Sequence, residues 1–214
     1  MFAAILRSEW RWCRGVLIPG TLAALLAPLL SLRGVTMRMM PVEVMNAVGH
    51  WSAVFPLLSL GLALLTALGC WGPDRRGDHI HALTLPVARW RYVLLRFGGG
   101  VLLLAAPMLA CLVGALLATH STSLPTGLAP YPWSFAFRFA ASLLVAFSLL
   151  FAILSATPKT AALVLGAVVL VTAADLALGI LMPRTGIGND VWFLLLNGPG
   201  PFALFAARWV LVDA

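Results

Sequence analysis

The chain has 214 residues, of which 62% are hydrophobic and 10% are charged, and its formal net charge is +7. Soluble domains carry about a quarter charged residues, so this composition excludes an ordinary soluble protein and predicts a polytopic membrane protein with a single domain, residues 1–214. The basic residues lie at the ends of apolar runs, which argues against nucleic-acid binding and favours the anionic surface of the lipid bilayer as their partner.

The first predicted element is an amphipathic helix over residues 1–14. Its apolar side chains recur at helical spacing: Phe2, Ile5, Leu6 and Trp10. Its polar side chains are Arg7, Glu9, Arg11 and Arg14. This pattern is typical of an interfacial helix that lies on the membrane. The apolar run that follows, residues 15–32, is too long for the core of a signal peptide and predicts the first span.

Four further apolar runs reach the roughly 20 residues that cross a bilayer. They predict spans at residues 51–71, 92–119, 135–155 and 161–182. In the second run, Ser59, Ala63 and Ala67 place small side chains on one face, a spacing that lets another helix approach closely and indicates a possible subunit contact.

The last apolar segment, residues 191–212, is interrupted by Asn197-Gly198-Pro199-Gly200-Pro201. Two prolines and two glycines at its middle disrupt a helix. It is either a kinked sixth span or a re-entrant element, which is tolerated where protein buries the freed backbone groups. The expected fold class is therefore an all-α polytopic membrane protein with five or six transmembrane helices.

The distribution of basic residues predicts the orientation. With a cytoplasmic N-terminus, ten basic residues fall inside: Arg7, Arg11, Arg14, Arg75, Arg76, Arg89, Arg91, Arg96, Lys159 and Arg208. Four fall outside: Arg33, Arg38, Arg138 and Arg184. Without a sixth span Arg208 moves outside and the ratio becomes nine to five, which selects the same orientation. We expect a multi-pass protein of the cell's inner (plasma) membrane.

Motifs for catalysis or cofactor binding are missing from the sequence. The only lysine, Lys159, follows no glycine-rich loop, so the phosphate-binding G-x-x-x-x-G-K-[ST] pattern is absent. The pair His79-x-His81 has no second pair of ligands, and Cys13, Cys70 and Cys111 are far apart without a CxxC motif. We therefore expect a chain that is not an enzyme and that binds no metal or cofactor itself.

Asp175 is the one acid deep in a predicted span. Intramembrane acids are costly and usually face protein or water with a partner. Arg138 lies at a similar depth in the fourth span if the predicted topology holds. The two residues are expected to form either a structural ion pair between neighbouring helices or part of a substrate path.

The connection of residues 72–91 joins the second and third spans and is dense in charge. Asp74 and Asp78 lie near the start of a predicted short helix, where the helix dipole favours acids. Ile80 and Leu83 share one apolar face of this helix, and Pro86 ends it. A basic loop that only sets topology would explain the arginines, but not an apolar-faced helix that ends at a proline.

At these residues the chain resembles the permease subunits of type 2 ABC exporters. The resemblance consists of an acidic and basic cluster, a glycine, a leucine-rich short helix, a Leu-Pro-Val-Ala-Arg turn and a later basic residue. In this chain they are Asp74 to Arg76, Gly77, Leu83, Leu85 to Arg89, and Arg96. The interfacial leader and the tight turn at residues 156–160 also fit, whereas His79 and His81 stand where the family more often has Thr and Glu.

The resemblance implies a half-transporter. Two permeases would pair as a homodimer or a heterodimer around a central pathway, each resting on a separate ATPase subunit that binds ATP and Mg. Residues 72–91 would then hold a cytoplasmic coupling helix whose ATPase-docking residues are Asp74, Arg75, Arg76, Gly77, Asp78, Ile80, Leu83, Leu85, Pro86 and Arg89. We expect export of a hydrophobic or amphipathic compound. The alternative is an intramembrane enzyme acting on a lipid-like substrate, which needs a polar cluster that Asp175 alone does not provide.

Overall fold

The computed structural model describes residues 2–76, 88–181, 200–206, 209 and 211–213. Its helices are α1 (Phe2–Ser31), α2 (Pro41–Gly49), α3 (Val54–Arg76), α5 (Arg89–Ser121), α6 (Pro132–Ser155), α7 (Pro158–Leu181) and α9 (Ala203–Ala206). Two short strands, β1 (Ala129–Pro130) and β2 (Val212–Asp213), are the other regular elements in this part of the chain. Four stretches are helical, long and apolar enough to cross a membrane: Phe2–Ser31, Pro41–Gly72, Trp90–Ser121 and Pro132–Ser155. The predicted class of all-α membrane protein is confirmed at this level.

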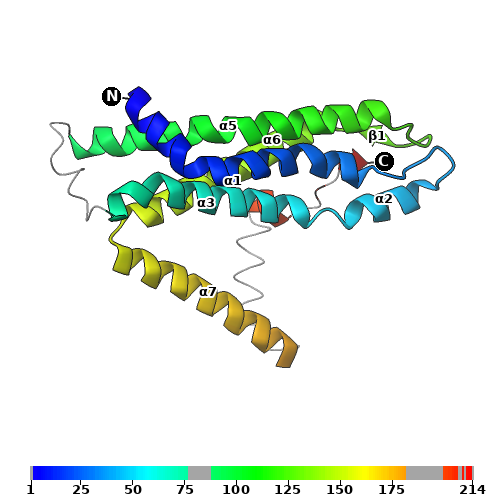
Figure 1. The fold of residues 1–214 in the computed structure, drawn as a ribbon. Helices are drawn as coiled ribbons and strands as arrows, with labels where there is room; N and C mark the ends of the chain where they lie inside the picture. Colours follow the sequence, from blue (N-terminus) through cyan, green and yellow to red (C-terminus); the bar gives the residue numbers. More distant parts are fainter. Residues whose placement is uncertain (1, 77–87, 182–199, 207–208, 210, 214) are drawn as a thin grey trace.

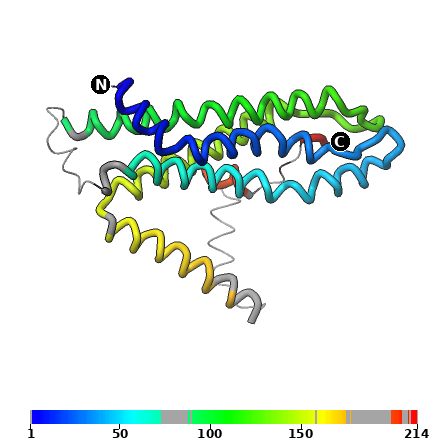
Figure 2. Tube along the Cα trace, viewed as in Figure 1, coloured from blue at the N-terminus to red at the C-terminus, as the bar shows by residue number. Residues whose placement is uncertain are grey.

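α1, α3, α5 and α6 lie side by side as a bundle (Figure 1). Each packs against two of the others, in the cyclic order α1, α5, α6, α3, while α3 and α5 lie across the bundle and touch little. We call one end of the bundle the N-terminal end: it holds Phe2, the end of α3, the start of α5 and the turn from α6 to α7. The opposite C-terminal end holds residues 32–40, residues 122–131 and the strands (Figure 2). Away from their ends, α-helices satisfy their backbone groups internally, which a lipid environment requires.

Glycines bring the helices close together. A Cβ on Gly114 of α5 would clash with the backbone carbonyl of Leu25 in α1, and a Cβ on Gly20 of α1 would clash with Leu62 of α3. Membrane helices gain little from apolar burial alone and associate by such close packing. Ser59, Ala63 and Ala67 are each 0% exposed within this single chain. Their face is occupied inside the protomer, so the suggested subunit contact is wrong.

α1 is one uninterrupted helix through the predicted junction at residues 14 and 15, and its first turns bend away from the rest of its axis (Figure 1). Glu9, expected on a polar face with the arginines, is instead 1% exposed. The reason lies in α5, where Gly99 leaves space that the carboxylate of Glu9 fills. α3 also extends further than the predicted span, through Gly72 and Pro73 to Arg76.

The last residues return to the C-terminal end. β2 pairs antiparallel with β1, Ala129 opposite Asp213, and the backbone N–H of Tyr131 donates to the carbonyl of Leu211 at 2.9 Å. Trp209 is 1% exposed and stacks 6.1 Å from Phe55 of α3, with Phe135 of α6 at 6.1 Å edge-on. In the described part of residues 191–212, the only helix is the four-residue α9, too short to span a membrane. Residues 191–199 lie outside the described residues.

α7 leaves the bundle at an angle after the turn at residues 156–157 (Figure 1). Most of its described side chains after Ala161 are apolar and exposed, with Leu163 at 72% and Leu170 at 69%. Such a helix must face lipid or other protein, because water does not solvate it favourably. Its first turns contact α6, and its later turns diverge from it.

The position of β2 predicts which side of the membrane the chain's last residues occupy. In variants that each add one cysteine, Asp213→Cys and Thr126→Cys should react with a membrane-impermeant maleimide from the same side, and Arg11→Cys from the opposite side; all three positions are exposed. The unaltered chain is the control, because Cys13, Cys70 and Cys111 are buried. Labelling of Asp213→Cys and Arg11→Cys from one side would contradict this arrangement.

Candidate functional site

The residues predicted to dock an ATPase flank or lie within the connection between α3 and α5. Asp74, Arg75 and Arg76 form the last turn of α3, and Arg89 begins α5, but the side chains of these four residues are not described. Gly77, Asp78, Ile80, Leu83, Leu85 and Pro86 lie outside the described residues, as do His79 and His81. The docking helix therefore stays a prediction, while the two helices that hold it are defined.

Arg96 joins these two helices at the N-terminal end. It is 5% exposed, and one of its terminal nitrogens donates to the backbone carbonyl of Cys70 in α3. Its guanidinium lies 5.5 Å from the ring centre of Trp71 in α3 and 5.0 Å from that of Tyr92 in α5. Cation–π contacts of this kind become stronger when water is excluded. α3 and α5 are thus held together beside the connection of residues 77–87.

Other polar groups are buried next to Arg96. The thiol of Cys13 donates to the carbonyl of Thr66 at 3.7 Å and packs against Gly69 of α3, where a Cβ would clash with it. The carboxylate of Glu9 packs against Gly99 and the thiol of Cys70 against Gly100, both within about one turn of Arg96 on α5, so the four side chains lie close together. We call Glu9, Cys13, Cys70 and Arg96 the buried polar cluster. Among the described residues, no group of three or more His, Cys, Asp or Glu side chains could hold a metal ion.

Aromatic rings support this cluster from α6. Trp71 lies 5.2 Å from Phe151, and Phe97 of α5 lies 5.6 Å from Phe147, measured between ring centres. Gly100 makes room for Phe147, since a Cβ there would clash with its ring. Through these rings α3, α5 and α6 pack together in one layer beside Arg96, near the N-terminal end.

Sequence reasoning missed this cluster, although one signal was present. Gly98, Gly99 and Gly100 stand together near the start of a span, where glycine weakens a helix. Such a run indicates that other groups approach the helix closely. Two of the three glycines have such a neighbour: the carboxylate of Glu9 lies against Gly99, and the ring of Phe147 lies against Gly100. The identity of the approaching acid could not be read from the sequence.

Arg138 lies at the C-terminal end and contacts the chain's last residues. Its Nε donates to the carbonyl of Leu204 at 3.0 Å, and its guanidinium lies 4.8 Å from the ring centre of Trp209. These contacts fix Leu204 and Trp209 against α6. Asp175 lies in α7, and its side chain is outside the described part of the chain, so the ion pair with Arg138 stays a prediction.

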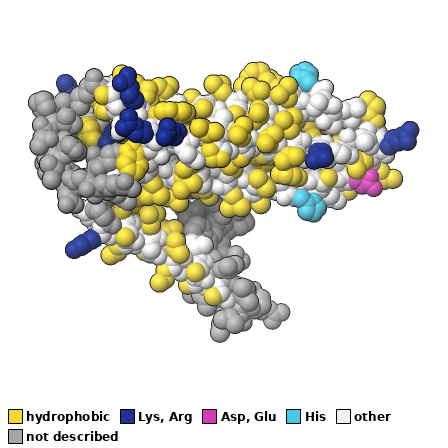
Figure 3. All heavy atoms as spheres, viewed as in Figure 1, with side chains coloured by type: hydrophobic (Ala, Val, Ile, Leu, Met, Phe, Trp, Pro, Cys, Tyr) yellow, Lys and Arg dark blue, Asp and Glu magenta, His cyan; other side chains and the backbone are white. Residues whose placement is uncertain are grey.

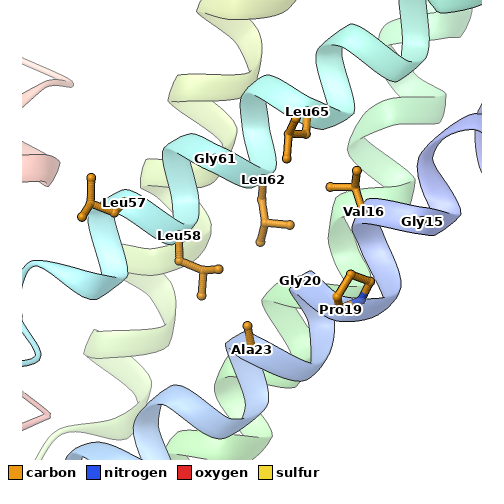
Figure 4. A pocket seen from close by; sticks show the side chains of 10 residues that line it. All are labelled: Gly15, Val16, Pro19, Gly20, Ala23, Leu57, Leu58, Gly61, Leu62 and Leu65. Carbon is orange, nitrogen blue, oxygen red and sulfur yellow. The ribbon is translucent and has the colours of Figure 1, made fainter.

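A groove runs along the surface between residues 15–23 of α1 and residues 57–65 of α3 (Figure 4). Its volume is about 400 Å³. Figure 4 shows Val16 and Ala23 on one wall and Leu58 and Leu62 on the other. Every residue that lines it is apolar or glycine, so it suits a hydrocarbon chain and offers no catalytic group.

No family model, no curated protein and no solved structure matches this chain.

The buried position of Arg96 predicts its contribution to stability. Arg96→Gln should lower the free energy of unfolding by roughly 3 kcal/mol, because it removes a charged hydrogen bond and leaves a buried site poorly filled. Arg91→Gln is the matched control: Arg91 is exposed on the same helix, 5.2 Å from the ring of Trp90, and its loss should change stability by about 0.5 kcal/mol or less. Thermal unfolding in detergent measures both. Equal melting temperatures for the two variants would show that Arg96 does not hold α3 and α5 together.

Proposed function

We propose that this protein is the permease subunit of a type 2 ABC exporter, which forms the membrane pathway and is driven by a separate ATPase. The observation that carries the proposal is the buried contact of Arg96 with α3. The segment with the resemblance, residues 74–89, joins two helices that Arg96 fastens to each other. A partner that pushes on this segment would therefore move α3 and α5 as a unit.

The distances suit such a transmission. Arg96 lies seven residues after Arg89, the start of α5, which corresponds to about 10 Å along a helix. Cys70 lies six residues before the end of α3 at Arg76. Cys70 and Arg96 thus lie about two turns from the end of α3 and from the start of α5, respectively. Two helices joined that close to their ends cannot splay when force is applied between them.

The proposed topology has five spans and a cytoplasmic N-terminal end. α7 is the fifth span, and the segment 191–212 is then the re-entrant element of the two alternatives, with β2 on the outer side beside β1. With this arrangement nine basic residues lie inside and five outside, which agrees with the preference for cytoplasmic Lys and Arg. The first turns of α1, which bend from its axis, are the proposed interfacial helix.

The proposed substrate is a hydrophobic or amphipathic compound. Support comes from the apolar groove between α1 and α3, which is open along the surface of the bundle (Figure 4). The exposed apolar face of α7 would meet either lipid or a second permease across the pathway. A homodimer and a heterodimer both satisfy these features.

An intramembrane enzyme is the second candidate, and the buried polar cluster is the observation that favours it. Glu9 could serve as an acid, and Cys13 or Cys70 as a nucleophile. The grooves do not favour it: neither the groove of Figure 4 nor the hollows beside Trp10 are lined by a residue of the cluster. A substrate in them would not reach these groups, so the permease is the better supported function.

Purification of the affinity-tagged chain from its native membrane tests the proposal. A soluble ATPase should copurify, and Leu83→Asp or Pro86→Gly should reduce the recovered ATPase about tenfold, because each disrupts the proposed docking helix. Val42→Asp is the control: Val42 is 67% exposed in α2 at the opposite end, and this change should leave recovery unaltered. Absence of an ATPase from the purified chain, or equal recovery with all three variants, would refute the docking assignment.

A further inference from the structure

The first turns of α1 present three arginines on one exposed face. Arg7, Arg11 and Arg14 occur at positions i, i+4 and i+7, and their side chains are exposed. Residues at this spacing line one side of an α-helix. Figure 3 shows Lys and Arg side chains gathered at this end of the molecule, next to a broad hydrophobic surface. We call these three residues the arginine stripe.

No carboxylate of α1 neutralises the stripe. Glu9 is the only acid between Phe2 and Ser31, and it is 1% exposed and packs against Gly99 of α5, on a different side of the helix. This face of α1 is therefore complementary to an anion.

Apolar hollows lie beside the stripe, between α1 and α5. One has a volume of about 400 Å³ and is lined by Arg7 itself with Leu6, Trp10 and Leu103. Another has a volume of about 280 Å³ and extends from Trp10 along α1 to Leu22, beside Ala106. Trp10 separates them and is 45% exposed, in the position that tryptophan favours between polar headgroups and hydrocarbon. The arginine stripe and the two apolar hollows are thus adjacent on one surface of the protein.

We propose that this surface binds one anionic phospholipid. Its phosphate lies on the arginine stripe, and an acyl chain lies in the hollow that extends from Trp10 to Leu22 beside Ala106. Arginine matches phosphate well because its fork of N–H groups donates two bonds at once. The groove of Figure 4 lies on the α3 side of α1 and has no charged side chain in its lining, so it offers no place for the headgroup. The proposed lipid site needs no ATPase and stands whether or not the chain is a permease.

Native mass spectrometry of the purified protein, titrated with phosphatidylglycerol or with phosphatidylcholine, tests this site. In Arg7→Gln/Arg14→Gln, the affinity for phosphatidylglycerol should fall roughly tenfold or more, since each arginine near an anionic lipid contributes a factor of about five. The control is Arg33→Gln/Arg38→Gln, which removes two exposed arginines from the opposite end and should leave that affinity unchanged. Phosphatidylcholine should bind all variants alike.

Ala106→Phe tests the acyl-chain half without altering charge. The larger side chain would fill the hollow, and the affinity for phosphatidylglycerol should fall about fivefold or more, because the displaced chain loses its apolar contacts. Equal loss of affinity in the two arginine double variants would mean attraction to overall charge and would overturn the proposed site. So would unchanged affinity in Arg7→Gln/Arg14→Gln with an unaltered melting temperature.

Discussion

A buried guanidinium fixes the geometry of the N-terminal end. Removing a cation from water costs several kcal/mol, so the side chain of Arg96 is stable in the bundle only while its contacts persist. Those contacts include the carbonyl of Cys70 and the rings of Trp71 and Tyr92. α3 and α5 lie across the bundle and touch little elsewhere, so this polar contact sets their spacing. The connection of residues 77–87 therefore joins two helices that Arg96 links to each other.

The remaining contacts depend on small residues that allow close approach. Gly114 lets α5 meet the backbone of α1 at Leu25, and Gly99 admits the carboxylate of Glu9 near the other end of the same helix pair. Between lipid-facing surfaces, where hydrophobic burial supplies little net energy, such contacts determine which helices are neighbours. At the C-terminal end, Arg138 and Trp209 hold the last residues against α6. The two ends are thus stabilised by different polar residues, joined by closely packed apolar helices.

Features set by local composition could be predicted from the sequence, and features set by distant contacts could not. Helical class, membrane character and the positions of the long apolar helices follow from runs of about 20 apolar residues. The burial of Glu9 depends on Gly99, which lies 90 positions further along the chain, so its polar neighbours Arg7 and Arg11 were misleading. The return of the last residues depends on Trp209 meeting Phe55 and Phe135, contacts that no local pattern encodes.

Transmission through Arg96 is measured most directly by ATP hydrolysis in proteoliposomes that contain this protein, the proposed permease, and its proposed ATPase partner. Arg96→Gln is compared with Arg91→Gln at equal amounts of assembled complex. If Arg96 transmits motion between the proposed docking segment and the bundle, the Arg96→Gln complex should still assemble. The change in hydrolysis rate that the membrane protein causes should then be roughly tenfold smaller with Arg96→Gln, and unaltered with Arg91→Gln. An Arg96→Gln complex that retains the full change would contradict a coupling role for this contact.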